Sequence, residues 1–384
     1  MAAKTVLILG GGTGGLVAAN RLRRLLAGEH RVVLVSRSYV YSFAPSYTWV
    51  MLGRRTGRRI SRDLRTLQQK GIEFVQGEVE AIDTERKRVR VGERELKYDY
   101  LMVALGAQYS ADEIEGLGRT WTYYHLEGAD GLQEELPRVS GGRIAIVVSG
   151  LPYKCPPAPY EGAFLLDDYF RRRKLRDAIE IRVFTPEPRP LRLAGEEVSG
   201  RLEEMLSQRG ISFMGGAQLS SVDHEHKLLH FADGGTAPWD TVIATPVHRA
   251  PDVLVRSGLA PAGGWVAVDR ETLATAAAED VYAIGDCTVV PLGDGLALPK
   301  AGVFAHGEAE VVARNISAEI SEGEPIWAYG GQGACFLETD GSHGSYISGH
   351  FFADPAPHVT MRHPSRIWHW AKVGFERLWL WRWF

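Results

Sequence analysis

The stretch TVLILGGGTGG, residues 5–15, decides the fold class. Its first five residues are a continuous apolar, β-rich run, which predicts a buried strand that ends at the glycines. Residues 16–26 then have the spacing of a helix, and residues 31–36 form a second apolar run. This order predicts a βαβ unit of the kind that binds dinucleotides.

Three glycines satisfy the pattern G-x-G-x-x-G in the turn after the first predicted strand: Gly10, Gly12 and Gly15. The first permits the tight turn, the second lets a pyrophosphate touch the backbone, and the third lets the helix and the strand pack closely. The N-terminus of the helix then faces the phosphates. The alternative is a glycine-rich loop without a ligand.

Further strands are predicted along the chain, at residues 100–105, 143–149, 181–185, 241–245 and 281–284. The run 143–149, a helix at 162–173 and the run 181–185 form a second βαβ unit. The sequence therefore predicts an α/β fold with two Rossmann-like domains. We expect the first domain at residues 1–110 and 265–325, the second at 111–264, and a C-terminal region at 326–384.

Composition excludes several classes of protein. The 384 residues carry a net charge of -3, which gives no field for nucleic acid, and no apolar stretch reaches the length of a membrane span. Three cysteines are too few for a disulfide framework, and no metal site is indicated. The first predicted strand starts almost at Met1, so we expect no signal peptide.

Two further segments resemble those of flavoprotein oxidoreductases with two dinucleotide domains. One is YDYLMVALGA, residues 98–107, which contains Gly106, and the other is VYAIGD, residues 281–286, which contains Gly285 and Asp286. The resemblance implies FAD, with Asp286 accepting hydrogen bonds from the ribityl chain. The alternative for Asp286 is a helix cap. Ser36 stands where a ribose-binding carboxylate usually ends the second strand, and it would bind a ribose hydroxyl more weakly.

The second Rossmann-like unit lacks a phosphate loop. Its first strand leads into SGLPYKCPPAPYE, residues 149–161, in which four residues are proline. Prolines cannot offer the row of backbone N–H donors that a pyrophosphate requires, so we do not expect NAD(P)H to bind there. Cys155 lies at the carboxyl end of this strand, where open α/β sheets bind ligands.

Several motifs resemble the sulfide:quinone oxidoreductases and the related flavocytochrome c sulfide dehydrogenase flavoprotein subunits. They are FAPSYTWV (43–50), KCPPAPYE (154–161), TPVH (245–248), GWVAVD (264–269) and PKAG (299–302). The resemblance implies a redox pair of Cys155 and Cys335, a sulfide substrate and a quinone acceptor. Which cysteine carries the persulfide stays open, and Cys335 alone would read as an inert core thiol. Cys287 is interpreted as a buried residue, and no third cysteine precedes Lys154.

Proton transfer needs further groups. Glu161, His248 and His125 are candidate general acids or bases, and the favoured alternative for each is a structural or surface residue. Lys300 resembles the family lysine near flavin and quinone, where a cation would stabilise negative charge. Its alternative is a solvated surface lysine. Phe336 is a candidate wall of the quinone pocket, or a packing residue.

The last residues, from Trp368 to Phe384, hold five of the ten tryptophans. Polar residues recur at Arg366, His369, Lys372, Glu376 and Arg377 among apolar ones, which predicts an amphipathic helix. Its tryptophans and basic excess favour a helix that lies flat on an anionic lipid surface. The alternative is burial in the core or in a homo-oligomer interface.

The sequence thus predicts a peripheral membrane flavoenzyme that oxidises sulfide and reduces a quinone. Three alternatives stay open: a type II NADH:quinone oxidoreductase, a sulfide dehydrogenase subunit with a cytochrome acceptor, and a flavin-binding redox sensor without turnover.

Overall fold

The computed structural model describes residues 2–384. Its first sheet is parallel, with the strand order β20-β9-β1-β2-β5. The strands of this sheet are β1 (Thr5–Leu9), β2 (Arg31–Ser36), β5 (Glu73–Gln76), β9 (Tyr100–Val103) and β20 (Val281–Ala283). Strands that precede and strands that follow residues 111–264 in the sequence therefore meet in one sheet, and β1 lies at the centre of this sheet.

The second sheet is also parallel, with the order β13-β12-β11-β17. Its strands are β11 (Gly142–Val148), β12 (Ile179–Thr185), β13 (Ile211–Gly215) and β17 (Thr241–Thr245). The predicted α/β fold with parallel sheets is confirmed. Helix α5 (Ala158–Arg172) begins four residues before the predicted start, because proline is tolerated in the first turn of a helix.

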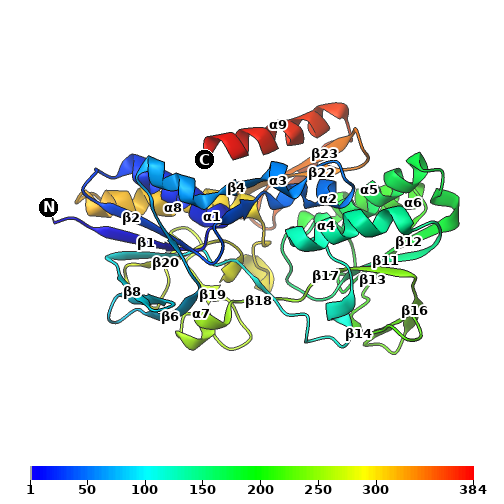
Figure 1. The fold of residues 1–384 in the computed structure, drawn as a ribbon, viewed down its shortest axis with the longest axis horizontal. Coiled ribbons are helices and arrows are strands. Elements are labelled where there is room, and N and C mark those ends of the chain that lie inside the picture. Colours follow the sequence, from blue (N-terminus) through cyan, green and yellow to red (C-terminus); the bar gives the residue numbers. More distant parts are fainter. Residues whose placement is uncertain (1) are drawn as a thin grey trace.

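Helices cover each sheet on the side that faces α9 (Arg366–Arg382) in Figure 1. Helix α1 (Thr13–Leu25) packs along α8 (Gly302–Ile320) over the first sheet. The other helices are α2 (Tyr47–Met51), α3 (Gly57–Ile60), α4 (Leu126–Glu135), α6 (Glu196–Gln208) and α7 (Asp252–Arg256).

Small antiparallel sheets complete each half. Two three-stranded meanders lie on the side of the molecule opposite α9 (Figure 1): β6 (Val79–Asp83), β7 (Arg88–Val91) and β8 (Arg94–Lys97), and β14 (Leu219–Asp223), β15 (Leu228–Phe231) and β16 (Thr236–Pro238). Two-stranded pairs join β3 (Val40–Ser42) to β4 (Ser61–Asp63), β10 (Gln108–Tyr109) to β18 (His248–Arg249), and β19 (Val266–Ala267) to β21 (Thr288–Val289).

The C-terminal region bridges the two halves. Strands β22 (Gln332–Glu338), β23 (Gly344–His350) and β24 (His358–Met361) form an antiparallel sheet, and β22 contacts both α8 and α5. Helix α9 lies across this sheet and across the helices of the first half, at the top of Figure 1. Strand β22 and helix α9 are therefore held against both halves of the chain.

The predicted C-terminal helix is confirmed, but its polar residues are divided between solvent and the interior, with Arg366 and Arg377 exposed. Lys372 and Glu376 are almost fully buried, whereas Ile367, Trp370 and Trp381 are exposed by 73%, 65% and 77%. Lys372 and Glu376 therefore face the protein together with Val373, Trp379 and Leu380, and an apolar stripe faces outward. Within residues 2–384, no helix combines the length and the hydropathy needed to span a bilayer.

Candidate active site

The glycine turn after β1 is as tight as the sequence predicts. A Cβ atom on Gly15 would lie 1.8 Å from the carbonyl oxygen of Gly10, and one on Gly10 would lie 2.1 Å from that of Ala104. Around Gly12 the space is open, because no atom lies within 4 Å of the position that its Cβ would take. Gly12 also caps α1 without any side-chain bond. The first N–H groups of this helix therefore remain available for phosphate oxygens.

Asp286 lies in a turn that is held from both sides. The Nζ atom of Lys300 donates to the carbonyl oxygens of Asp286 (2.9 Å) and Thr288 (2.8 Å), and Oε2 of Glu308 accepts from the backbone N–H of Gly285 at 2.6 Å. Oδ1 of Asp286 is buried and has no hydrogen-bond partner in the described protein. Burial raises the pKa of Asp286, and it raises that of Glu308 to about 7. An unpartnered buried carboxylate oxygen suits the hydroxyl donors of a ribityl chain.

The other predicted cofactor residues lie around the same two turns. Ser36 ends β2, and its Oγ atom lies 2.7 Å from the position of a Cβ on Gly11. Gly106 follows β9 with a φ of +69° and has open space at its Cβ position. The residues at these turns therefore fit FAD, with the phosphates at Gly12 and the ribityl chain at Asp286.

Cys155 lies between the two halves of the protein. Its backbone N–H donates to the carbonyl oxygen of Lys300 at 2.7 Å, and its own carbonyl accepts from Ala158 in the first turn of α5. A φ of +54° places it in the left-handed region, which a non-glycine residue rarely adopts and which often marks functional sites. Cys155 is exposed to solvent. Burial and Glu161 raise the pKa of this thiol to about 11, against the opposing effect of Lys372.

Cys335 lies in β22, which packs against α5, the helix that follows Cys155. Burial and the neighbouring Cys155 raise the pKa of the Cys335 thiol. The fold thus brings the two predicted partners, 180 residues apart in sequence, into one region. All three cysteines are free thiols in the structure, so the redox disulfide of Cys155 and Cys335 stays a prediction.

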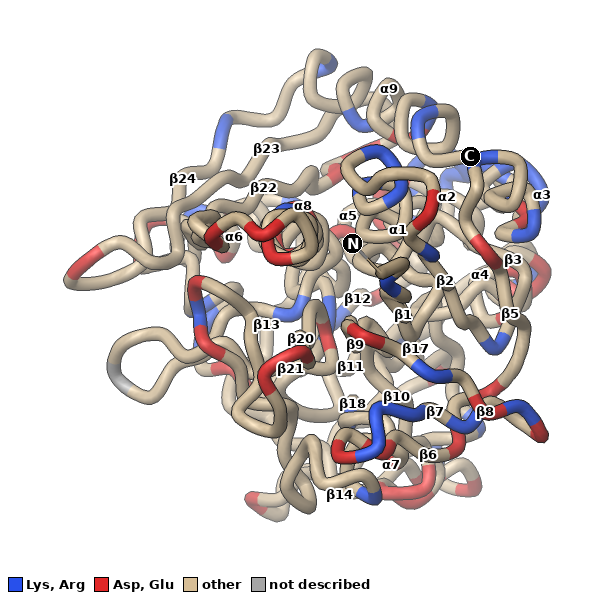
Figure 2. Tube along the Cα trace, turned by 90° about the vertical axis from the view of Figure 1, so that its left-hand side faces the viewer, with Lys and Arg blue, Asp and Glu red and all other residues tan. Residues whose placement is uncertain are grey.

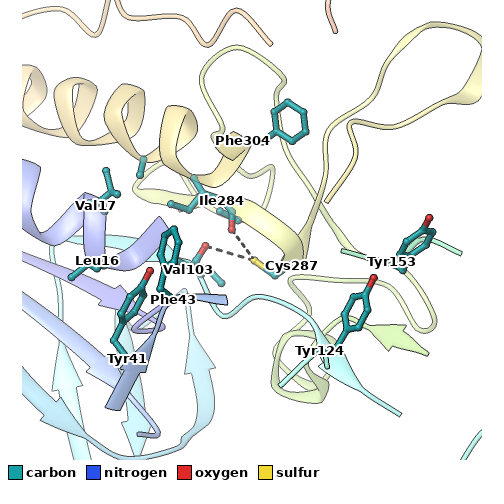
Figure 3. Close-up of a cluster of buried hydrophobic side chains, with 14 of the residues drawn as sticks. Leu16, Val17, Tyr41, Phe43, Val103, Tyr124, Tyr153, Ile284, Cys287 and Phe304 are labelled. Carbon is teal, nitrogen blue, oxygen red and sulfur yellow. Dashed lines mark hydrogen bonds between the residues drawn. The ribbon is translucent and has the colours of Figure 1, made fainter. Parts of the chain in front are cut away.

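Cys287 is fully buried, in agreement with its interpretation as a packing residue. Figure 3 shows its sulfur among core side chains of the first half, with weak hydrogen bonds to the carbonyl oxygens of Val103 (3.7 Å) and Ile284 (3.3 Å). Burial raises the pKa of Cys287 to about 12.

Glu161 is buried and joins segments from across the chain. Its carboxylate accepts from Thr48 Oγ1 at 2.6 Å, from Lys372 Nζ at 2.8 Å and from the backbone N–H of Glu338 at 3.0 Å. The last of these contacts connects Glu161 to β22, three residues after Cys335. The carboxylate thus lies beside the cysteine pair with its hydrogen-bonding positions largely occupied.

The two histidine candidates differ. His248 is buried against the rings of Tyr109 and Tyr124, and burial lowers its pKa to about 3. Its Nε2 atom has no partner among the described residues. His125 instead caps α4, where its Nδ1 atom accepts from the backbone N–H of Gly128 at 2.9 Å. This bond is a structural role, which the sequence analysis left open for His125.

Lys300 is buried, so the surface-lysine alternative is wrong. Its Nζ atom lies 3.4 Å from the ring centroid of Trp265, and burial lowers its pKa to about 8. Phe336 follows Cys335 in β22, and successive strand residues face opposite sides. Its ring contacts Tyr346 and Phe375, the latter on α9. Phe336 therefore lies on the α9 side of β22.

Sequence reasoning missed two lysines. Lys154 lies 4.8 Å from the ring centroid of Tyr109, and although burial opposes it, Tyr109 and Asp286 raise the pKa of Lys154. Its position directly before Cys155 was the available signal. The basic excess of the C-terminal helix predicts Lys372 at a lipid surface, but Lys372 is paired with Glu161 in the interior. No signal within the helix could have identified a partner 211 residues away.

Two tyrosines bond to a carboxylate at the end of a strand in the second parallel sheet. The hydroxyl of Tyr153 donates to Glu187 Oε2 at 2.9 Å, and that of Tyr160 lies 3.5 Å from the same oxygen. Glu187 follows β12, the place from which a carboxylate binds the ribose in dinucleotide-binding folds. This carboxylate is already bound by the protein itself, which supports the expectation that NAD(P)H does not bind there.

Comparisons with known proteins agree with this geometry. The chain is 28% identical to the mitochondrial sulfide:quinone oxidoreductase of Mus musculus over 347 residues, which cover 87% of this chain and 75% of that protein. It is 25% identical to the sulfide-quinone reductase of Aquifex aeolicus (strain VF5), with 99% and 91% covered. These matches confirm the resemblance that the motifs predict.

The structural comparison concerns the fold. The X-ray structure of the sulfide:quinone oxidoreductase from Aquifex aeolicus matches with a TM-score of 0.89 at 24% identity, covering 99% of this chain and 91% of that one. The sequence pattern of one family, described as pyridine nucleotide-disulphide oxidoreductase, extends over residues 4–309. The chain belongs to the pyridine nucleotide-disulphide oxidoreductase family.

Proposed function

We propose that this protein oxidises sulfide to sulfane sulfur or polysulfide through Cys155 and Cys335, with FAD as the cofactor and a membrane quinone as the electron acceptor. The observation that carries the proposal is the convergence of Cys155, Cys335 and the turn of Asp286, because Cys155 bonds to Lys300 and Lys300 bonds to Asp286. The names of the relatives from Mus musculus and Aquifex aeolicus support the same substrates.

FAD would be held by Gly10, Gly12 and Gly15 at its phosphates, by Ser36 at a ribose and by Asp286 at the ribityl chain, with Gly106 and Gly285 forming the turns beside them. When bound, this cofactor accepts two electrons from sulfur and passes them to the quinone. Lys300 would stabilise negative charge on the reduced groups from its position beside Asp286.

The cysteines would handle the sulfur. Hydrosulfide attacks a Cys155–Cys335 disulfide, the S–S bond breaks, and one cysteine becomes a persulfide while the other leaves as a thiolate. A second hydrosulfide attacks the outer sulfur of the persulfide and releases disulfane, so both cysteines are then reduced. Reoxidation of the pair to the disulfide gives up two electrons, and the quinone that finally accepts them also takes up two protons.

Proton transfer would involve Glu161 and His248, and Phe336 would form part of the quinone site. Glu161 lies beside both thiols and bonds to Lys372 of α9. Phe336 lies on the α9 side of β22, next to Phe375. A quinone that approaches from the α9 side would therefore meet Phe336 before it met the cysteines.

The outward apolar stripe of α9 supports docking at a membrane surface as a peripheral protein. Exposed tryptophans prefer the headgroup boundary, and a helix of this kind lies in the plane of that boundary. The acceptor would then be a quinone dissolved in the same bilayer.

Anaerobic mixing with sulfide tests the proposal. We expect the flavin absorbance of the wild-type holoenzyme to bleach on sulfide addition and to return when a quinone is added. The variants Cys155→Ser and Cys335→Ser should keep the bound flavin, but sulfide should no longer bleach it. Flavin absorbance that does not change when sulfide is added would refute the proposal. Bleaching of the flavin by micromolar NADH would favour the NADH:quinone alternative.

A further inference from the structure

A group of unpaired arginines lies beside α9. Arg58 and Arg59 in α3 and Arg62 in β4 are exposed, and none of the three forms an ion pair within residues 2–384. Their neighbours in the sequence differ, because Arg55 pairs with Glu376 and Arg65 pairs with Asp63. We name Arg58, Arg59 and Arg62 the arginine cluster.

The chain holds the arginine cluster against the flank of α9 at two points. On one side, Arg55 donates to Glu376 of α9 at 2.9 Å. On the other, the hydroxyl of Tyr41 in β3 accepts from Trp379 Nε1 at 2.7 Å, and Tyr41 pairs with Arg62 across the β3–β4 ladder. Residues directly opposite each other in a ladder have side chains on the same face. Arg62 therefore lies on the face of the ribbon that Tyr41 presents to α9.

The figures show the same arrangement. In Figure 1, α3 and β4 lie directly beneath α9, and in Figure 2 the basic residues around α3 lie beside the end of α9 that carries the C-terminus. The apolar stripe of α9, formed by Ile367, Trp370, Phe375, Leu378 and Trp381, is exposed next to them. Val40, the first residue of β3, and Tyr39 before it add exposed apolar surface.

We propose that the arginine cluster binds the headgroup phosphates of anionic phospholipids while the apolar stripe of α9 enters the headgroup boundary. The inference rests on the membrane docking in the proposed function and adds to it the residues that would bind the anionic lipid. A guanidinium binds phosphate in a bidentate manner, and a basic group close to an apolar helix face matches an anionic bilayer in both charge and polarity.

One basic residue of the C-terminal helix does not belong to the proposed docking surface. Lys372 is buried and paired with Glu161, so it does not contribute charge to this surface. Arg377 is exposed on α9 and directly follows Glu376, the residue to which Arg55 donates. A bilayer that contacts α9 would therefore meet basic side chains along the flank formed by α3 and β4.

Vesicle flotation of the full-length holoenzyme tests this proposal. The variant Arg58→Gln/Arg59→Gln/Arg62→Gln is compared with the control Arg86→Gln/Arg90→Gln/Arg94→Gln. The control removes the same charge from exposed arginines of the β6–β8 meander, on the side opposite α9. The probes are vesicles of phosphatidylcholine alone and vesicles that also contain phosphatidylglycerol.

We expect wild type and control to bind the anionic vesicles more tightly than the neutral ones, with an affinity that falls as salt is raised. Each basic residue near the surface contributes about tenfold or less to the affinity for an anionic membrane. The arginine-cluster variant, which lacks three of them, should therefore bind anionic vesicles about 100-fold more weakly than wild type does. It should bind neutral vesicles as wild type does. Inorganic phosphate should weaken binding no more than sodium chloride at the same ionic strength, because the apolar stripe also contributes to binding.

Other outcomes separate the two proposals. If wild type binds neutral and anionic vesicles equally and the arginine-cluster variant binds as wild type does, the lipid-class inference is wrong and docking stands. If wild type binds neither kind of vesicle, docking itself is wrong. If wild type binds no vesicles but forms a dimer, and the arginine-cluster variant does not form that dimer, the partner of this surface is a second copy of the chain and not a bilayer.

Discussion

The Cys155 thiol lies among charges of both signs, and its reactivity should follow them. Glu161 raises the pKa of Cys155, and Lys154 opposes it. We therefore expect Glu161→Gln to lower this pKa and Lys154→Met to raise it, so that the thiolate fraction at a fixed pH rises in the first variant and falls in the second. The alkylation rate of Cys155 by iodoacetamide as a function of pH, followed by peptide mass spectrometry, measures both shifts.

Buried Cys287 provides an internal control in the same digests, because its alkylation should stay slow in all variants. Equal pH profiles for the wild type and both variants would contradict the assignment of these charges to Cys155. Opposite displacement of the two profiles is the outcome that the geometry predicts.

His248 makes a second prediction, because its pKa of about 3 in the folded protein lies below its ordinary value of 6.5. As the pH falls below 6.5, the unfolded chain takes up the proton first, so folding stability decreases. Between pH 6.5 and pH 5 this loss is about 2 kcal/mol. Urea unfolding at both pH values should show the loss in wild type and a smaller loss in His248→Gln. The same pH dependence in both proteins would mean that His248 is not buried in the neutral form.

Among the elements, the sheets could be predicted and the C-terminal helix only in part. Parallel strands that are buried on both faces are short apolar runs, which is why residues 31–36 and 241–245 have the same bounds in sequence and structure. The amphipathic pattern located α9 correctly. It could not show that Lys372 and Glu376 are buried, because a period of 3.6 does not identify partners for charged side chains elsewhere in the chain.

The site was less predictable than the sheets, for a related reason. The glycine turn is local, so its residues could be assigned from spacing alone. Glu161 meets Thr48, Lys372 and the backbone of Glu338, and none of these contacts follows from local pattern. The pairing of Cys155 with Cys335 came from family resemblance, because their approach depends on how β22 packs against α5.

The ion pair between Lys372 on α9 and Glu161 on α5 should couple these two helices energetically. The Glu161–Lys372 ion pair is buried on both sides, so removal of one partner should leave an uncompensated charge and cost about 3 to 5 kcal/mol. Replacement of both, as in Glu161→Gln/Lys372→Met, should cost less than Lys372→Met alone. Urea unfolding of the four proteins gives the double-mutant cycle. Additive losses would show that the two residues do not interact in solution.

At the scale of the whole molecule, α9 and β22 lie against both halves of the chain. The helix that is proposed to dock on lipid therefore also covers the proposed active site. Trp370 and Trp381 are exposed on this helix, and the other side of the helix bonds to Glu161 through Lys372. A quinone dissolved in a bilayer would therefore reach the protein from the α9 side, whereas a short-chain quinone in water could reach it without docking.

This arrangement predicts a split between the two acceptors. Trp370→Ser/Trp381→Ser removes apolar surface that points away from the protein, so sulfide-driven bleaching and turnover with a water-soluble quinone should stay close to wild type. Turnover with a quinone dissolved in vesicles should fall by about tenfold or more, because docking weakens. Steady-state assays with both quinones measure this ratio. An equal loss with both would mean that the tryptophans support the site itself, and no loss with either would mean that quinone delivery does not depend on α9.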